Sequence, residues 1–176
     1  MKFLLTIAVI IVAGCAAAPA ISPVDSSPRI KARVAIAMSP EERTMQTQLY
    51  YYYKGVWFEE GRVVREAALK AFAERFEAAA SREDSGSFDV VVEVEGNSIL
   101  NPQFSTYYAT AIARAYLPNG ELIGQYSATS SHYASFGNLA YEQLYQQTYN
   151  EAFAQVARQL AQSEALGRAL KRGAPT

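Results

Sequence analysis

The chain contains one cysteine, Cys15, and one histidine, His132, so few side chains are available for nucleophilic or acid–base chemistry. His132 follows Ser130 and Ser131, and a remote carboxylate would complete the serine–histidine–acid arrangement of acyl transfer. Adjacent serine and histidine side chains, however, rarely point at each other. The sequence also has no G-x-S-x-G elbow, no G-x-x-x-x-G-K-[ST] loop and no G-x-G-x-x-G loop. We therefore expect His132 to lie in an exposed loop and the chain not to be an enzyme.

Three carboxylates, Asp89, Glu93 and Glu95, raise the possibility of a paired-carboxylate hydrolase. Along an extended segment they alternate with apolar residues: Val90, Val92 and Val94. We interpret them as the solvated face of a strand, because successive side chains of a strand point to opposite faces. A metal cluster would lack histidine and cysteine ligands, which leaves only a weak Ca²⁺ possibility at Glu83 and Asp84. We expect no metal site and no cofactor.

Tyrosine is the most informative residue type, since the chain has twelve of them. Tyr50, Tyr51, Tyr52 and Tyr53 are consecutive, and Trp57 follows closely. If this segment is a strand, alternate rings face opposite ways and at least two cannot join the same core. Tyrosine and tryptophan are favoured at interfaces because they combine apolar area with a hydrogen-bonding tip. We predict that these five residues form a partner-binding edge for a protein, a glycan or the bilayer surface. The alternative is that one face covers the core and the other is half exposed at a sheet edge.

The N-terminus, MKFLLTIAVIIVAG, has a short positive region at Lys2 and an apolar stretch from Phe3 to Val12. A bilayer-spanning helix needs about 20 apolar residues, so this stretch is too short to span. It fits the apolar region of a cleavable signal peptide. Val12, Ala13, Gly14 and Cys15 follow, and this segment resembles the lipobox of bacterial lipoproteins.

The resemblance implies that the mature protein begins at Cys15, whose sulfur carries a diacylglyceryl group and whose amine carries a further acyl chain. Two or three chains anchor a protein firmly to a membrane, whereas one anchors it only marginally. Inner-membrane lipoproteins often carry aspartate after the cysteine, and here Ala16 and Ala17 follow. The resemblance therefore favours the outer membrane. The alternative is an ordinary signal peptide cut near Ala18, with Cys15 removed.

Composition limits the partners of the chain. Half of its 176 residues are hydrophobic, 19% are charged, and the formal net charge is −1. A near-neutral chain lacks the positive field that neutralises phosphates, so nucleic acid is not expected as a partner. The length suits one domain with appendages.

The sequence predicts four segments. Residues 1–14 form the signal peptide, and residues 15–28 form a lipidated tether rich in proline, serine and alanine that cannot bury enough apolar surface to fold. Residues 29–165 form the globular domain, and residues 166–176 form a flexible tail.

Within the domain, periods of two predict strands at residues 30–38, 88–95, 105–117 and 122–130. The segment 49–58 is a strand or an ordered aromatic loop. Periods near four predict amphipathic helices at residues 60–80 and 139–162. Residues 96–104 and 131–138 are expected to be loops, and the turn Pro118–Gly120 joins the last two strands.

These elements predict an α+β fold of two layers, in which two helices pack on one face of a mostly antiparallel sheet of three or four strands. Alanines on one face of strand 105–117 should pack inward, because small residues let a helix approach closely.

The anchor, the tether and the absence of catalytic motifs lead to one functional hypothesis. The chain is an outer-membrane-anchored lipoprotein on the periplasmic face, a non-enzymatic accessory or assembly subunit that binds another envelope protein. The alternative is a lipoprotein that binds a ligand such as a glycan, a lipid or a peptidoglycan fragment.

Overall fold

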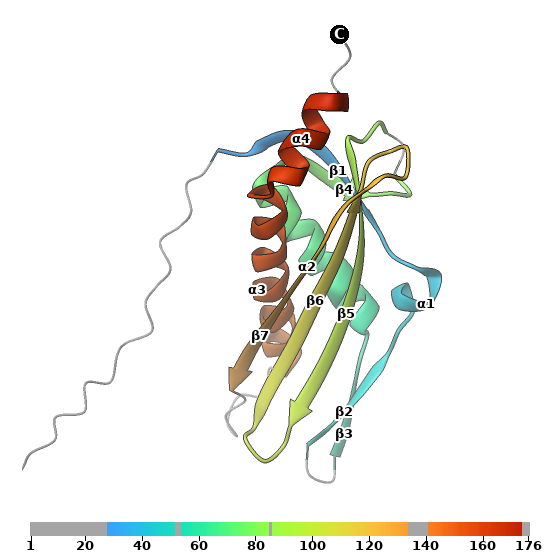
Figure 1. Ribbon diagram of the computed structural model, residues 1–176. Helices are drawn as coiled ribbons and strands as arrows, with labels where there is room; N and C mark the ends of the chain where they lie inside the picture. Colours follow the sequence, from blue (N-terminus) through green and yellow to red (C-terminus); the bar gives the residue numbers. More distant parts are fainter. Residues whose placement is uncertain (1–27, 52–53, 85, 134–140, 174–176) are drawn as a thin grey trace, which may run out of the picture.

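The structure is a computed structural model that describes residues 28–51, 54–84, 86–133 and 141–173 (Figure 1). The predicted signal peptide, Cys15 and almost all of the predicted tether lie outside these residues. Tyr52 and Tyr53 also lie outside them.

A five-stranded sheet forms one layer of the domain, in the order β4-β1-β5-β6-β7. The strand β1 (Ile30–Ala37) pairs in parallel with β4 (Phe76–Ser81) on one side and with β5 (Val90–Asn101) on the other. The long strands β5, β6 (Thr106–Tyr116) and β7 (Leu122–Tyr133) pair antiparallel. The predicted sheet of three or four mostly antiparallel strands is therefore wrong in detail, because β1 lies between two parallel neighbours.

Helices form the other layer. The helices α2 (Glu60–Arg75) and α3 (Tyr141–Ala161) lie together on one face of the sheet (Figure 1). In the described part of the chain, the opposite face of the long strands carries no helix. Two shorter helices, α1 (Pro40–Arg43) and α4 (Glu164–Gly173), complete the described part of the chain. The predicted α+β class is confirmed.

The alanines of β6 explain how closely the layers pack. Ala109, Ala111, Ala113 and Ala115 are all buried and face the helices. Opposite them, α3 contributes large side chains to the core, among them Tyr145, Tyr149, Phe153 and Leu160. The expectation that the alanine face packs inward is confirmed.

The helix predicted for residues 60–80 ends earlier, at Arg75. The next residue, Phe76, is buried and opposes Ile30 at the start of the parallel β1–β4 pair. Residues 76–81 carry alanine and glutamate, which favour helix, but pairing with β1 and burial of Phe76 override that local preference.

Three further predictions of loop or tail are wrong. The strand β5 continues through the predicted loop at 96–104 as far as Asn101, because β6 pairs with it along its whole length. The strand β7 extends to Tyr133, which places His132 in the sheet and not in a loop. Residues 164–173 form α4, which buries Leu166 and Ala169 although residues 166–176 were expected to be a flexible tail.

The predicted aromatic segment is a separate two-stranded hairpin made of β2 (Thr47–Tyr51) and β3 (Lys54–Phe58). The capping box of α1, in which Ser39 and Glu42 exchange hydrogen bonds, turns the chain from β1 towards this hairpin. In Figure 1 the hairpin and the β5–β6 turn lie at the same end of the molecule, whereas α4 and the start of β1 lie at the other end.

Candidate partner-binding surface

The hairpin has two chemically different faces. Gln48 opposes Trp57 and Tyr50 opposes Gly55, so Tyr50 and Trp57 share one face. The Tyr50 side chain is 60% exposed and the Trp57 side chain is 62% exposed. The Tyr50 hydroxyl donates a hydrogen bond of 2.5 Å to the Gln48 side-chain oxygen. A Cβ atom at position 55 would lie 2.3 Å from the Gln48 amide nitrogen, so Gly55 leaves room for this arrangement. We call Tyr50 and Trp57 the hairpin surface.

The other face of the hairpin is fixed to the domain core. Leu49 and Phe58 are buried, and the Phe58 ring stacks on Tyr145 of α3 with 4.5 Å between ring centroids. These buried contacts hold β2 and β3 against the domain, although the two strands pair with no other strand in the described ranges. The exposed side chains of Tyr50 and Trp57 therefore lie on a hairpin whose opposite face is buried against the core.

A buried polar cluster ties the hairpin to both long helices. Glu60, at the start of α2, is only 2% exposed. Its carboxyl group accepts hydrogen bonds from the Thr47 hydroxyl of β2 and the Tyr149 hydroxyl of α3. The neighbouring Tyr145 hydroxyl lies 2.9 Å from the Ser98 hydroxyl of β5. The cluster satisfies a carboxyl group that would otherwise be costly to bury.

Burial also fixes the protonation of the two tyrosines. Desolvation by burial is the main cause that raises the pKa of both Tyr145 and Tyr149 above the ordinary value, and the charge of Glu60 adds to it. In Tyr149 the neighbouring Tyr145 contributes as well. Both phenols therefore stay protonated at any physiological pH, and the Tyr149 hydroxyl keeps donating its hydrogen bond to Glu60.

Gly96 of β5 makes the space for this cluster. A Cβ atom at position 96 would lie 2.3 Å from a methyl carbon of Val64 and 2.9 Å from the Tyr149 ring. A side chain at this position would displace Tyr149 or α2. Glycine is therefore required here by close packing and not by a turn.

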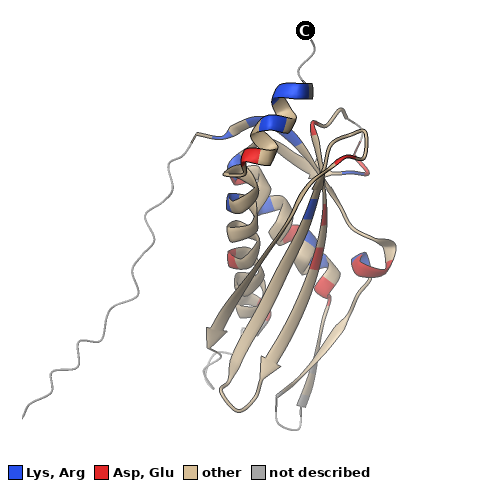
Figure 2. Ribbon diagram, viewed as in Figure 1, with Lys and Arg blue, Asp and Glu red and all other residues tan. Residues whose placement is uncertain are grey.

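A second group of exposed apolar side chains lies where β5, β6 and β7 meet at the same end of the molecule. Ile99 and Tyr108 oppose each other on the helix-free face, and Tyr133 extends from the end of β7. Ile99, Phe104 and Tyr133 are at least 60% exposed, and Tyr108 is 39% exposed. We call these four residues the sheet-end cluster. Figure 2 shows that the long strands carry no Lys, Arg, Asp or Glu over this half of their length.

A tight turn presents Phe104 to solvent. The Asn101 side-chain oxygen accepts hydrogen bonds from the backbone N–H groups of Gln103 and Phe104, and the Thr106 hydroxyl donates to the Phe104 carbonyl. Ser105 adopts φ of 48°, the left-handed region that non-glycine residues seldom occupy. Such a conformation costs free energy and is typical of tight turns.

A cavity of about 500 Å³ lies where β1 ends and β5 continues. Its lining is charged and aliphatic, with no aromatic side chain: Ile36, Ala37, Met38, Ser39, Glu42, Arg43, Arg65, Ser81, Arg82, Glu83, Glu93, Val94 and Glu95. Burial raises the pKa of the Glu42 carboxyl, the charge of Glu95 raises it further, and the hydrogen bonds from Ser39 oppose both effects. Arg43 pairs with Glu83 at the rim.

The sole histidine lies beside a serine and a carboxylate, but not in a catalytic order. The Ser130 hydroxyl donates a hydrogen bond of 2.9 Å to Glu151 of α3. The His132 Nε2 atom also lies 2.9 Å from a Glu151 oxygen, although this contact does not have hydrogen-bond geometry. A serine nucleophile needs its hydroxyl bonded to the imidazole, and here the carboxylate stands between the two. This geometry gives no support to acyl transfer.

Over residues 28–51, 54–84, 86–133 and 141–173, no group of three or more His, Cys, Asp or Glu side chains could hold a metal ion. In the same ranges, no helix has the length and apolar composition needed to cross a bilayer. The expected absence of a metal and of a cofactor stays a prediction.

Comparison with known proteins assigns no family. No family model matches the chain, and no curated protein matches it either. Among solved structures, the chain is similar to the crystal structure, at 2.40 Å resolution, of a "putative lipoprotein" from Caulobacter crescentus CB15. The similarity covers 81% of this chain and 93% of that chain, with 14% sequence identity and a TM-score of 0.44. At these values the similarity establishes neither the fold nor the function of this chain.

The predicted site residues have different outcomes. Tyr50 and Trp57 are exposed on one face of the hairpin, Tyr51 ends β2, and Cys15, Tyr52 and Tyr53 lie outside the described residues. Whether these residues bind a partner stays a prediction. The sheet-end cluster was not predicted from the sequence. Its sequence signal was the outward position of Tyr108 in the strand pattern, together with Phe104 in a turn that contains Asn101 and Pro102.

Proposed function

We propose that this chain is a lipoprotein of the outer membrane, acylated at Cys15 and held on the periplasmic face, that acts as a non-enzymatic accessory or assembly subunit. The segment from Val12 to Cys15 supports the anchor. Few side chains of the chain are suited to catalysis, and Ser130 and His132 both lie against Glu151 and not against each other. This arrangement supports a binding role over an enzymatic one.

The observation that carries the binding role is the pair of exposed aromatic side chains on the hairpin surface. Tyr50 and Trp57 are each about 60% exposed, while the reverse face of the same ribbon is buried against Tyr145. Aromatic side chains on a supported ribbon lose little conformational entropy on binding. Aromatic residues of this kind also supply most of the energy at protein interfaces. A protein partner with an apolar pocket is the occupant that this surface fits best.

The alternative function, binding of a glycan, a lipid or a peptidoglycan fragment, calls for aromatic side chains that line a groove. The cavity beside β1 and β5 has no aromatic side chain in its lining. The exposed aromatics instead lie on a ribbon and on a sheet face. This separation between the cavity and the aromatic side chains favours a protein partner.

Site-specific photo-crosslinking in the native bacterium tests the proposal. A benzoylphenylalanine residue in place of Trp57 or Tyr50 should give the same covalent product with one envelope protein. The matched control is Leu122, which is 55% exposed at the opposite end of β7 and should give no such product. Equal products from all three positions, or none from positions 50 and 57, would exclude the hairpin surface as the binding site.

A further inference from the structure

Positive charge is gathered at the end of the molecule where the chain leaves the predicted tether. Arg29 and Lys31 are exposed at the start of β1, and Arg168, Lys171 and Arg172 are exposed on α4. Figure 2 shows these blue segments together at the end of the molecule that also carries the turn between β6 and β7. The bond of 2.9 Å between Arg172 and Glu121 confirms that α4 and this turn are neighbours. We call these five cations the basic end.

Nearby carboxylates neutralise only part of this charge. Arg172 pairs with Glu121, and Arg168 lies 4.0 Å from Glu164, which is itself almost fully exposed. Glu77 is also exposed, at the start of β4. Among the described residues, no ion pair is formed by Arg29, Lys31 or Lys171. The basic end therefore keeps a net positive charge on a chain whose overall charge is −1.

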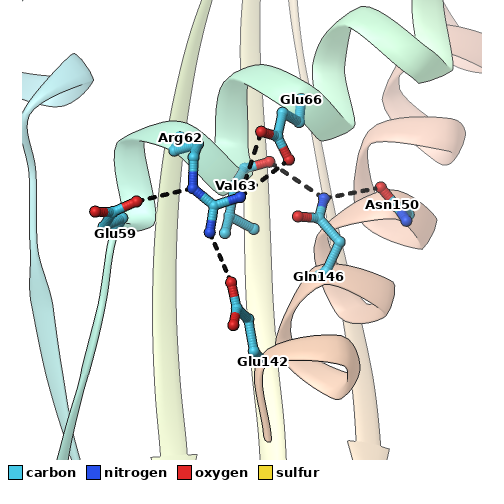
Figure 3. A network of polar contacts seen from close by, with 7 residues as sticks. All are labelled: Glu59, Arg62, Val63, Glu66, Glu142, Gln146 and Asn150. Carbon is cyan, nitrogen blue, oxygen red and sulfur yellow. Dashed lines mark hydrogen bonds and ion pairs between the residues drawn. The ribbon is translucent and has the colours of Figure 1, made fainter. Parts of the chain in front are cut away.

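The opposite sign is found towards the starts of α2 and α3. Three exposed glutamates surround a single arginine, and Arg62 bonds to Glu59, Glu66 and Glu142 (Figure 3). These bonds, led by those to Glu59 and Glu142, raise the pKa of Arg62 above its already high ordinary value. The cluster still holds two more negative charges than positive ones. The two ends of the domain therefore differ in sign, and an external charged surface would orient the whole molecule.

The helix α4 presents its charges and hides its apolar side. Leu166 and Ala169 are each 1% exposed and pack against the domain, while the three cations point to solvent. An apolar face that is already covered is not available to enter a bilayer. This helix can therefore contact a membrane through its charges, at the level of the lipid headgroups.

The length of the predicted tether does not determine which end of the domain faces the membrane. From Cys15 to Pro28 the backbone can extend at most about 45 Å. A strand as long as β5, with twelve residues, spans about 40 Å. Either end could therefore reach a bilayer to which Cys15 is anchored. The charge difference between the two ends then determines which of them faces the membrane.

We infer that the basic end lies against the anionic headgroups of the membrane that holds the lipid anchor, so that the hairpin surface and the sheet-end cluster point away from the bilayer. The inference rests on the proposed anchor at Cys15. Attraction of Lys and Arg to an anionic leaflet fades within about one Debye length. The orientation is therefore sensitive to salt and to the content of anionic lipid. It leaves the aromatic surface free for a partner.

The single tryptophan makes the orientation measurable. The lipidated protein is reconstituted on vesicles of phosphatidylcholine alone and on vesicles that also contain phosphatidylglycerol, each with and without brominated acyl chains. We expect Trp57 fluorescence to be unaffected by brominated lipid and quenched by acrylamide in water. Amide exchange in α4 and at the start of β1 should slow several-fold only on the anionic vesicles. That protection should be lost at 1 M salt, where the Debye length is about 3 Å.

Charge variants separate the surface from the anchor. The triple variant Arg168→Gln, Lys171→Gln and Arg172→Gln should lose the protection on anionic vesicles, whereas Arg65→Gln with Arg82→Gln, at the cavity rim, should keep it. Quenching of Trp57 by brominated lipid would place the aromatic end on the bilayer and overturn the inference. Protection that is equal on both kinds of vesicle would overturn it as well. Protein that fails to float with any vesicle would show instead that the anchor itself is absent, which removes the proposed function together with this inference.

Discussion

Tyr149 of α3 donates a hydrogen bond to the carboxyl group of Glu60, the residue with which α2 begins. The second carboxyl oxygen accepts from Thr47 of the hairpin, so one buried group joins three elements that are distant in the chain. The hairpin surface depends on this junction, because β2 and β3 pair with no other strand among the residues that the structure describes.

Removal of the Tyr149 hydroxyl should therefore lower the free energy of unfolding. In Tyr149→Phe the ring still fills its place, but Glu60 loses the hydrogen bond from Tyr149 inside the core. A buried acceptor that loses its hydrogen-bond donor typically destabilises a protein by about 1–3 kcal/mol. Urea unfolding measures the change. Tyr133→Phe, which removes a hydroxyl from a side chain that is 66% exposed, serves as control and should change stability by less than about 0.5 kcal/mol. Equal effects of the two substitutions would contradict the role given to Glu60.

The same cluster predicts how stability depends on alkaline pH. Burial raises the pKa of Tyr145 and Tyr149 in the folded state, whereas both phenols ionise near pH 10 in the unfolded chain. Above pH 10 the unfolded state therefore loses protons that the folded state keeps, and stability falls as pH rises. Each tyrosine contributes up to about 1.4 kcal/mol per pH unit. Urea midpoints between pH 9 and 11 should show this slope, with a shallower slope in Tyr149→Phe. An unchanged slope in the variant would mean that Tyr149 ionises normally in the folded protein.

The two faces of the hairpin should respond differently to truncation. Phe58→Ala removes a buried ring stacked on Tyr145 and should cost about 3–5 kcal/mol. Trp57→Ala removes the larger side chain of the preceding residue, which faces solvent, and should change stability by no more than about 0.5 kcal/mol. Thermal or urea unfolding of both variants makes the comparison. A Trp57→Ala variant as unstable as Phe58→Ala would mean that Trp57 is part of the core and not of a binding surface.

Two glycines offer a matched pair of alanine substitutions. Gly96→Ala would place a methyl group against Val64 and Tyr149, and overpacking of this kind costs about 1–3 kcal/mol. Gly167→Ala lies within α4 with nothing within 4 Å of the new methyl group, so it should raise stability by up to about 1 kcal/mol. Opposite signs for the two are expected in equilibrium unfolding. A stabilised Gly96→Ala would show that β5 and α3 pack less closely than described.

The long elements of the fold could be predicted from sequence because their periodicity has a physical cause. Ala109 to Ala115 alternate with larger residues in β6, and this alternation indicated both the strand and its inner face. The helices around Phe72 and Phe153 could be predicted from apolar spacing in the same way. Each of these patterns is local, so a single segment contains all the information.

The parts that could not be predicted depend on contacts between distant segments. The sequence FEAAAS at residues 76–81 favours helix, and only the edge of β1 makes it a strand. Leu166 and Ala169 of α4 were predicted to lie in a flexible tail, because the surface that buries them belongs to other elements. Of the candidate surface, Tyr50 and Trp57 were visible in the sequence as aromatic excess. The outward position of Tyr108 was visible as well, but the sheet-end cluster as a whole was not, because only the pairing of β5, β6 and β7 brings Ile99, Tyr108 and Tyr133 to one end of the sheet.

The proposed lipid anchor at Cys15 can be measured by intact-mass and N-terminal peptide mass spectrometry of the protein purified from its own membranes. We expect that removal of the first 14 of 176 residues leaves a chain of 162 residues that begins at Cys15. This cysteine should carry a diacylglyceryl group on sulfur and an acyl chain on its amine. A mature chain that begins after Ala18, or one whose Cys15 carries no lipid, would show that the protein is not a lipoprotein.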